Sequence, residues 1–194
     1  MIIRIATPDD ACEALAIYAQ SIDTPVTFEY ELPTPEEFAR RIRSTLEHYP
    51  YLVCCDEAGT VRGYAYAGRF GERAAYQWGA ELSIYLDVAA IARGYGSRLY
   101  AALIALLRLQ GIRVVYGCVT MPNPRCERLH EKLGFRRCGL FRNAGFKCGA
   151  WRDVAWFEKE IAAWDGEGTP PEPVPFSGIS PETAAKTIAR VEHG

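Results

Sequence analysis

Hydrophobic positions divide the first fifty residues into one strand and two helices. Residues 2–6 are an almost continuous apolar run, which predicts a short strand. The sequence Thr-Pro-Asp-Asp at 7–10 is typical of a helix start, because threonine can cap a helix and proline suits its first position. A similar sequence at 34–37 predicts a second helix that reaches His48. After the first start, apolar side chains recur at helical spacing at Ala11, Leu15, Tyr18, Ala19 and Ile22.

The chain between residues 50 and 160 is predicted to alternate between strands and helices. Residues 80–88 show the clearest strand pattern, with three apolar side chains on one face and Glu81, Ser83 and Tyr85 on the other. By the same criteria we expect further strands at 51–56, 61–68 and 114–119, a final strand pair from 135 and at 153–159, and helices at 94–110 and 124–133.

The order of these elements indicates the fold class. Because strands and helices do not alternate one by one, we expect an α/β protein of the α+β type. Its central sheet would be mixed and mostly antiparallel, with about seven strands and helices on both faces.

A change of composition near residue 165 predicts a domain of residues 1–164 followed by a tail of 165–194. The segment 166–176 is rich in proline and glycine, so we expect an extended tether that contributes nothing to the core. Ser180 and the residues after it can then cap a short terminal helix.

Composition narrows the class of protein. Of 194 residues, 49% are hydrophobic and 24% charged, and the net charge of −2 gives no general attraction to nucleic acid or to anionic membranes. The first ten residues do not resemble a secretory signal, and no apolar run is long enough to span a bilayer, so we expect a cytoplasmic protein. The seven cysteines show no CxxC spacing, and we expect no metal site.

A glycine-containing loop between the strand at 80–88 and the helix at 94–110 is the main candidate for chemistry. Gly94 and Gly96 stand where the helix begins, and the first helical N–H groups have no partners within the helix. These groups and the helix dipole could hold a pyrophosphate. Leu99 replaces the third glycine of a dinucleotide fingerprint, and no P-loop sequence occurs. The motif alone is also compatible with an ordinary tight turn.

Other short motifs before and after the glycine loop help to interpret it. The sequence contains YxWxxE at 76–81, RGxGS at 93–97, PN at 122–123, RLHExLGF at 128–135 and GFKxGxWxDV at 145–154. Together they resemble the GNAT acetyltransferases, and within them the branch that acetylates phosphinothricin, methionine sulfoximine or methionine sulfone. The resemblance covers about residues 2–161. It implies acetyl-CoA as cosubstrate, a small amino-acid-like acceptor with a primary amine, and a homodimer.

The resemblance implies two catalytic residues. Glu81 matches the general base, and a carboxylate would need partial burial that raises its pKa to accept a proton from the acceptor amine. The alternative is an acid that simply faces solvent. His130 stands where a proton donor to the departing thiolate is expected, and the alternative is a structural histidine.

The resemblance also assigns the cofactor residues. The cradle would consist of Ile91, Ala92, Arg93, Gly94, Tyr95, Gly96 and Ser97, mostly through backbone N–H groups. Ile84, Tyr85 and Leu86 would contact the pantetheine arm along the strand edge. Asn123 would contact coenzyme A, and its alternative role is a helix cap.

Acceptor recognition is implied at Phe28, Arg73 and Tyr76. Arg73 could pair with a carboxylate or with an oxidised phosphorus or sulfur group, and its alternative is a solvated loop. Gly71 stands where some of these enzymes have lysine, so phosphinothricin and a neutral methionine sulfone are equal candidates.

Two other functions stay open at this point. The enzyme could acetylate a polyamine, an aminoglycoside or a protein amine, for which an acidic acceptor cleft would be expected. It could also bind acyl-CoA without turnover, as a sensor or scaffold.

Overall fold

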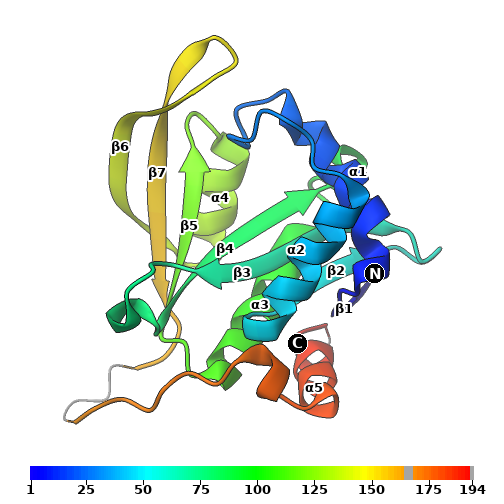
Figure 1. Ribbon diagram of the computed structural model, residues 1–194, viewed down its shortest axis with the longest axis vertical. Helices are drawn as coiled ribbons and strands as arrows, with labels where there is room; N and C mark the ends of the chain where they lie inside the picture. The colour runs from blue at the N-terminus through cyan, green and yellow to red at the C-terminus, as the bar shows by residue number, and fades with distance from the viewer. Residues whose placement is uncertain (164–167, 193–194) are drawn as a thin grey trace.

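A computed structural model describes residues 1–163 and 168–192 and contains one seven-stranded sheet (Figure 1). The strand order is β1-β2-β3-β4-β5-β7-β6, and every neighbouring pair is antiparallel except β4 with β5. The predicted fold class is confirmed. The strands are β1 (Ile2–Ile5), β2 (Tyr51–Cys55), β3 (Val61–Arg69), β4 (Gly79–Leu86), β5 (Val114–Thr120), β6 (Arg136–Lys147) and β7 (Ala150–Glu160).

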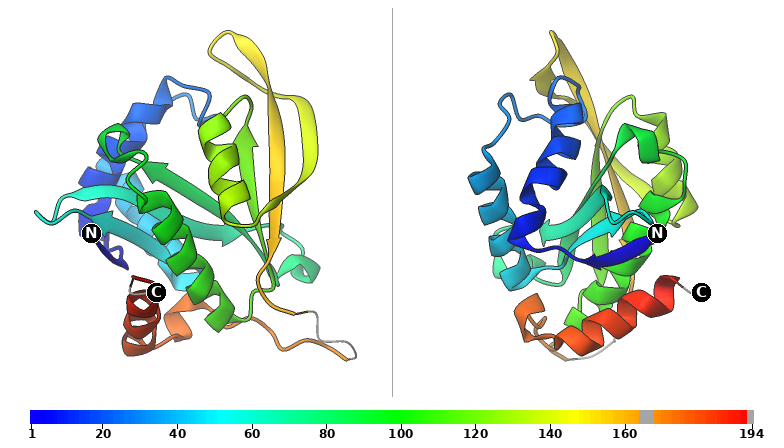
Figure 2. Two further views of the ribbon diagram at one scale, coloured as in Figure 1. Left: turned by 180° about the vertical axis from the view of Figure 1, so that it is seen from behind. Right: turned by 90° about the vertical axis from the view of Figure 1, so that its right-hand side faces the viewer.

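Helices cover both faces of the sheet (Figures 1 and 2). On one face lie α1 (Ala11–Ile22) and α2 (Pro35–His48), and on the other lie α3 (Tyr95–Gln110), α4 (Pro124–Lys132) and α5 (Pro181–Glu192). Short 3-10 turns occur at Pro8–Asp10, Ala74–Tyr76, Val88–Ala90 and Phe176–Gly178. The Thr34 hydroxyl accepts a hydrogen bond from the Glu37 N–H at 3.1 Å, which confirms the predicted start of α2.

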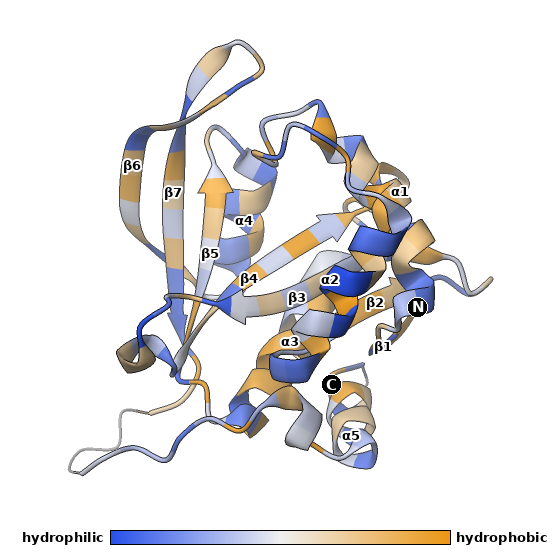
Figure 3. Ribbon diagram, viewed as in Figure 1, coloured by the Kyte–Doolittle hydropathy of each residue, from blue (hydrophilic) through white to orange (hydrophobic). Residues whose placement is uncertain are grey.

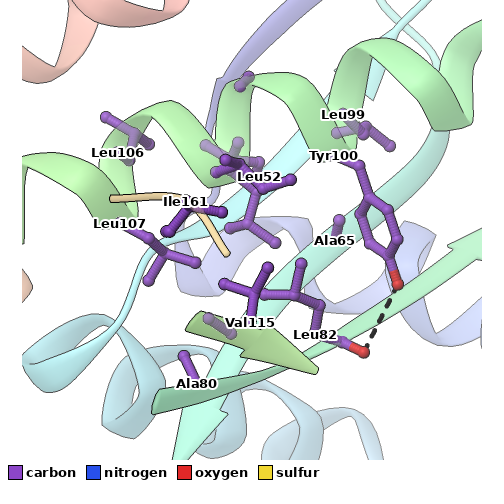
Figure 4. Close-up of a cluster of buried hydrophobic side chains, with 14 of the residues drawn as sticks. Leu52, Ala65, Ala80, Leu82, Leu99, Tyr100, Leu106, Leu107, Val115 and Ile161 are labelled. Carbon is purple, nitrogen blue, oxygen red and sulfur yellow. Dashed lines mark hydrogen bonds between the residues drawn. The ribbon is translucent and has the colours of Figure 1, made fainter. Parts of the chain in front are cut away.

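The larger part of the core lies between the sheet and α3. Leu99, Leu106 and Leu107 on α3 are fully buried against side chains such as Leu82 and Val115 of the sheet (Figure 4). Each such leucine contributes about 1.5–3 kcal/mol through burial of its apolar surface. This packing fixes α3, and therefore its N-terminal loop, against β4.

β4 and β5 separate part-way along their length. Their parallel pairing runs from Gly79 opposite Val114 to Leu82 opposite Gly117. Both strands then continue unpaired with each other, β4 to Leu86 and β5 to Thr120. In Figure 1 the two arrows diverge, and we call the region between their unpaired backbone edges the wedge.

The tail is part of the core, so the expectation of a segment without core contacts is wrong at Phe176. Phe176, Ala184 and Ile188 are 7%, 1% and 4% exposed and belong to the same cluster as α3. The Ile3 N–H donates to the Glu192 carboxylate at 2.8 Å, which ties α5 to β1. The proline-rich composition predicted an extended backbone for this segment. It could not predict that Phe176 is buried, because the surface that covers Phe176 is formed by residues far away in the sequence.

Two other expectations about the tail have different outcomes. The predicted helix cap is confirmed, because the Ser180 hydroxyl accepts from the Thr183 N–H at 3.2 Å. The predicted domain boundary between 164 and 165 lies outside the described residues. Among the helices of 1–163 and 168–192, none has the length and apolar character needed to cross a membrane.

We expect Ile188→Ala to lower the free energy of unfolding by about 2–5 kcal/mol, because it leaves a cavity between α5 and α3. Chemical denaturation monitored by circular dichroism measures this change. Lys186→Ala on the exposed side of α5 is the control, and its loss should stay below about 0.5 kcal/mol because it removes only a surface ion pair. Equal stability of the two variants would show that the tail is not docked in solution.

Candidate active site

Glu81 lies at the closed end of the wedge. It stands opposite Gly68 on β3 and Tyr116 on β5, one residue before the pairing of β4 with β5 ends. Its side chain is half-buried, and this burial raises the pKa of its carboxyl group. A carboxylate with a raised pKa is a better base near neutral pH than an exposed one.

Space is available beside the Glu81 side chain. Residues opposite each other in an antiparallel pair point to the same face, so Gly68 shares the face of Glu81. A Cβ atom at Gly68 would meet no atom within 4 Å. The absence of a side chain there leaves room for a small molecule next to the carboxyl group.

The predicted glycine loop forms the N-terminal end of α3. Gly94 has φ +84° and precedes the helix, and the first bond of the helix is donated by the Arg98 N–H to the Gly94 carbonyl at 3.3 Å. The N–H groups of residues 95–97 come before this bond and are therefore available to a ligand. A Cβ at Gly96 would lie 3.3 Å from Leu86 and 3.5 Å from Ile84, so the helix end packs closely on β4.

The last part of β4 separates two environments. Ile84 and Leu86 point toward α3, whereas Tyr85 points to the opposite face and stacks on Tyr64 with ring centroids 5.3 Å apart. The backbone of these residues follows the open edge of the wedge. A ligand that enters the wedge can therefore contact their backbone, while the Tyr85 ring is turned toward α1 and α2.

His130 is buried directly under β5. Its side chain is 1% exposed and packs between Phe135 and Phe157. A Cβ at Gly117 would lie 2.2 Å from His130 Nε2, so the ring rests on the backbone where β4 and β5 separate. Nδ1 lies 2.8 Å from the Cys126 carbonyl, which assigns the proton to Nδ1. Burial lowers the pKa of the imidazole and favours its neutral form.

Comparison with known proteins shows the family of the chain. A family model described as "Acetyltransferase (GNAT) domain" matches residues 3–156. The chain belongs to the GNAT acetyltransferase family. It is 35% identical to a phosphinothricin N-acetyltransferase of Streptomyces viridochromogenes, over 89% of this chain and 92% of that protein.

Other relatives belong to the same branch. A methionine sulfoximine/methionine sulfone acetyltransferase of Pseudomonas paraeruginosa is 31% identical over 82% of this chain and 94% of its own length. The crystal structure of a phosphinothricin acetyltransferase from Sinorhizobium meliloti in complex with AcCoA superposes with a TM-score of 0.80, at 35% identity over 94% of this chain and 96% of that one. This GNAT protein is therefore an acetyl-CoA-dependent acetyltransferase.

Two features of this GNAT chain are compatible with acetyl-CoA. Backbone N–H groups at the start of α3 suit a pyrophosphate, and the open edge of β4 offers unpaired backbone groups to an amide-containing arm. Neither feature needs the side chain of Ile91. Among the described residues no cluster of potential metal ligands occurs.

Asn123 has the geometry of a helix cap, which was the alternative to contact with coenzyme A. Its side-chain oxygen accepts a hydrogen bond from the Cys126 N–H at 3.2 Å and so caps α4. This cap fixes the start of the helix that carries His130. Contact of Asn123 with coenzyme A stays a prediction.

The three predicted acceptor residues come from two segments. Phe28, in the loop between α1 and α2, packs over Gly145 of β6, where a Cβ would lie 2.4 Å from its ring. Arg73 and Tyr76 lie in the loop that leads into β4 and are exposed. The Tyr76 ring contacts Phe70, which itself stacks on Tyr116 with ring centroids 3.8 Å apart. Acceptor binding by these three residues stays a prediction.

Sequence reasoning placed Tyr85 on the Glu81 face but missed the tyrosines beside it. Tyr64 and Tyr66 of β3, together with Tyr51 and Tyr85, line a cavity between the sheet and helices α1 and α2. The alternation of Tyr64 and Tyr66 in the strand was a usable signal for one shared face. The cavity itself depends on strand register, which the pattern does not provide.

We expect Gly117→Ala to destabilise the protein by about 1–3 kcal/mol, because the new methyl group would overlap the His130 ring. Gly68→Ala is the matched control, since its methyl group meets open space and should change stability by less than about 0.5 kcal/mol. Thermal and denaturant unfolding of the two variants gives the comparison. A Gly117→Ala variant as stable as wild type would contradict the placement of His130.

Proposed function

We propose that this enzyme transfers the acetyl group of acetyl-CoA directly to the primary amine of a small amino-acid-like acceptor, with Glu81 as general base. The observation that supports this most strongly is the half-buried Glu81 carboxyl group at the closed end of the wedge. The helix end that suits the pyrophosphate lies along the same strand, β4.

The reaction follows from these positions. The acceptor binds as an ammonium ion, and Glu81 takes one proton from it, directly or through a water molecule. The free amine then attacks the thioester carbon, and the carbon–sulfur bond breaks. The attacking nitrogen loses its second proton as the amide forms, and this proton goes, through solvent, to the departing thiolate. Unpaired backbone N–H groups of β4 beyond Leu82 can stabilise the charge that develops on the carbonyl oxygen.

The role of His130 follows its hydrogen bond. With the proton on Nδ1 and a neutral ring, Nε2 carries a lone pair and cannot donate a proton to the thiolate. The geometry therefore favours the structural alternative, in which His130 supports the backbone at Gly117.

We expect Glu81→Gln to lower kcat by about 10²–10⁴-fold, because the amide cannot accept the amine proton. Acetyl-CoA affinity should stay within about twofold of wild type, since its predicted contacts lie at residues 84–86 of β4 and at residues 91–97, which lead into α3. Thiol-release kinetics and calorimetric titration measure the two quantities. Unchanged turnover would remove Glu81 from the mechanism.

The pH profile tests the same group independently. The base must be deprotonated, so the activity of the wild type should fall as the pH drops through the raised pKa of Glu81, which lies above the ordinary value of 4.5. In Glu81→Gln this acidic limb should disappear.

An acceptor panel decides between the remaining functions. Phosphinothricin, methionine sulfoximine, methionine sulfone, several amino acids, spermidine and an aminoglycoside should be compared in the thiol-release assay. Turnover only with spermidine or the aminoglycoside would contradict an amino-acid-like acceptor. Tight coenzyme binding without turnover of any acceptor would support the non-catalytic alternative.

The assembly is proposed to be a homodimer that uses the β6 edge of the sheet. β6 is an edge strand, and hydrophobic and hydrophilic residues alternate along it and β7 (Figure 3). Phe141, Phe146 and Trp151 are 59%, 48% and 63% exposed, which is unusual for large apolar side chains. Light scattering should give twice the chain mass, and Trp151→Arg should lower it. A monomer at all concentrations would exclude this assembly.

A further inference from the structure

The loop between β4 and α3 consists of two halves with different hydrogen bonding. In the first half, residues 87–90, every N–H group donates a hydrogen bond. In the second half, residues 91–94, the Arg93 N–H, which donates to the Ala90 carbonyl at 3.4 Å, is the one N–H group with a partner among residues 1–163 and 168–192. The second half is therefore the part whose N–H groups are available to a ligand.

The second half also contains a residue in an unfavourable conformation. Ala92 has φ +66°, in the left-handed region that residues other than glycine rarely adopt. Such a conformation persists only where the surrounding structure enforces it. Because the second half has few hydrogen bonds of its own, its shape depends on what holds its two ends. One end is α3, whose Gly96 packs closely on Leu86 of β4, and the other is the first half of the loop.

Asp87 organises the first half from within. Its carboxylate accepts a hydrogen bond from the Ala89 N–H at 3.1 Å, and its carbonyl accepts one from the Ala90 N–H at 2.8 Å. The bond from Ala89 caps the 3-10 turn Val88–Ala90. Ala90 at the end of this turn is 2% exposed, so the turn is fixed by burial as well as by its cap.

Two segments distant in the sequence hold Asp87 and the turn after it. From β3, the Arg62 guanidinium donates to the Asp87 carboxylate at 2.9 Å, and the Arg62 carbonyl accepts from the Asp87 N–H at 3.0 Å. From α1, the Gln20 side-chain oxygen accepts from the Val88 N–H at 2.9 Å. Arg62 is itself oriented by a second ion pair, with Asp56 at 2.7 Å. The first half is thus fastened to two neighbouring elements besides β4.

We propose that Asp87, supported by Arg62 and Gln20, is a positioning residue for the coenzyme. By fixing the first half of the loop, it keeps the second half in the shape that binds the pyrophosphate before acetyl-CoA arrives. A loop that is already ordered loses less conformational freedom on binding, so the affinity is higher. None of the three side chains needs to touch the coenzyme. The proposal rests on the proposed pyrophosphate cradle at residues 91–97.

Calorimetric titration of coenzyme A measures the effect without turnover. We expect Asp87→Ala to raise the Kd about 5–20-fold, because the turn loses its cap and its ion pair. Asp87→Asn keeps an oxygen that can accept from the Ala89 N–H, so its Kd should stay within about threefold of wild type. An Asp87→Ala variant that binds coenzyme A as tightly as wild type would overturn the proposal, and so would an Asp87→Asn variant as weak as Asp87→Ala.

Asp10→Ala is the matched control, because Asp10 makes the same kinds of contact at the other end of α1. Its carboxylate pairs with Arg4 at 2.6 Å and accepts from the Thr7 N–H at 2.7 Å. Asp10 is 5% exposed, so its loss should destabilise the protein at least as much as the loss of Asp87, yet leave the Kd of coenzyme A within about twofold. Asp10→Asn replaces it where the alanine variant does not fold. Equal weakening of coenzyme binding in the control would overturn the proposal.

S-acetylpantetheine distinguishes this proposal from the one on which it rests, because it carries the thioester but no pyrophosphate. Asp87→Ala should lower kcat/KM for acetyl-CoA about 5–20-fold through KM, while kcat/KM for S-acetylpantetheine stays within about twofold of wild type. Equal losses with both donors would contradict a role in holding the cradle. A wild type that uses both donors equally well would instead refute the cradle itself.

Hydrogen exchange in the coenzyme-free protein reports on the loop directly. The Ala89 and Ala90 amides should exchange at least about tenfold faster in Asp87→Ala than in wild type, and the Val88 amide should exchange faster in Gln20→Ala. The Asp10 control should leave these amides unchanged. Exchange at the wild-type rate in Asp87→Ala would show that Asp87 does not hold the loop.

Discussion

The separation of β4 from β5 is the constraint on which the site depends. Beyond Leu82 and Gly117 the facing edges keep their backbone groups unpaired, which is costly unless water or a ligand satisfies them. Each strand is held on its other side, β4 by β3 as far as Leu86 and β5 by β7 as far as Thr120. The wedge therefore cannot close by sliding one strand, and its unpaired edges stay available for a substrate.

The same strands provide stability on one face and chemistry on the other. Alternate residues of β4 face α3, where Leu82 is nearly fully buried in the main core. The residues between them face α1 and α2, where Glu81 and Tyr85 lie near open space. Because a strand alternates its side chains strictly, the core on one face can be closely packed without filling the face that carries Glu81. A glycine is important on each face. Gly68 has no side chain to fill the space on the Glu81 face, and the lack of a side chain at Gly117 allows the His130 ring to pack against the backbone of β5.

Local patterns were sufficient for most of the elements and for the position of the glycine loop at the start of α3. The alternation around Glu81 placed it on the less apolar face of its strand, and Gly94 and Gly96 marked the start of α3, as observed. The features that the sequence could not predict are those that depend on contacts between distant segments. Phe176 is buried only because α3 and the sheet offer it a surface, and the row of tyrosines is assembled from β2, β3 and β4 through register.

The electrostatic setting of Glu81 differs from that of other buried acids in the chain. Asp10 is paired with Arg4 at 2.6 Å, and Asp87 with Arg62 at 2.9 Å. Burial alone would raise the pKa of Asp10, but the hydrogen bond from Arg4 helps to bring it below the ordinary value. The Ala89 N–H and, after it, Arg62 lower the pKa of Asp87. For Glu81, burial is the cause that acts, and it raises the pKa. Glu81 is a half-buried carboxyl group beside open space and has no ion-pair partner among residues 1–163 and 168–192. Such a carboxyl group, placed where two strands separate, is suited to take the proton of an incoming amine.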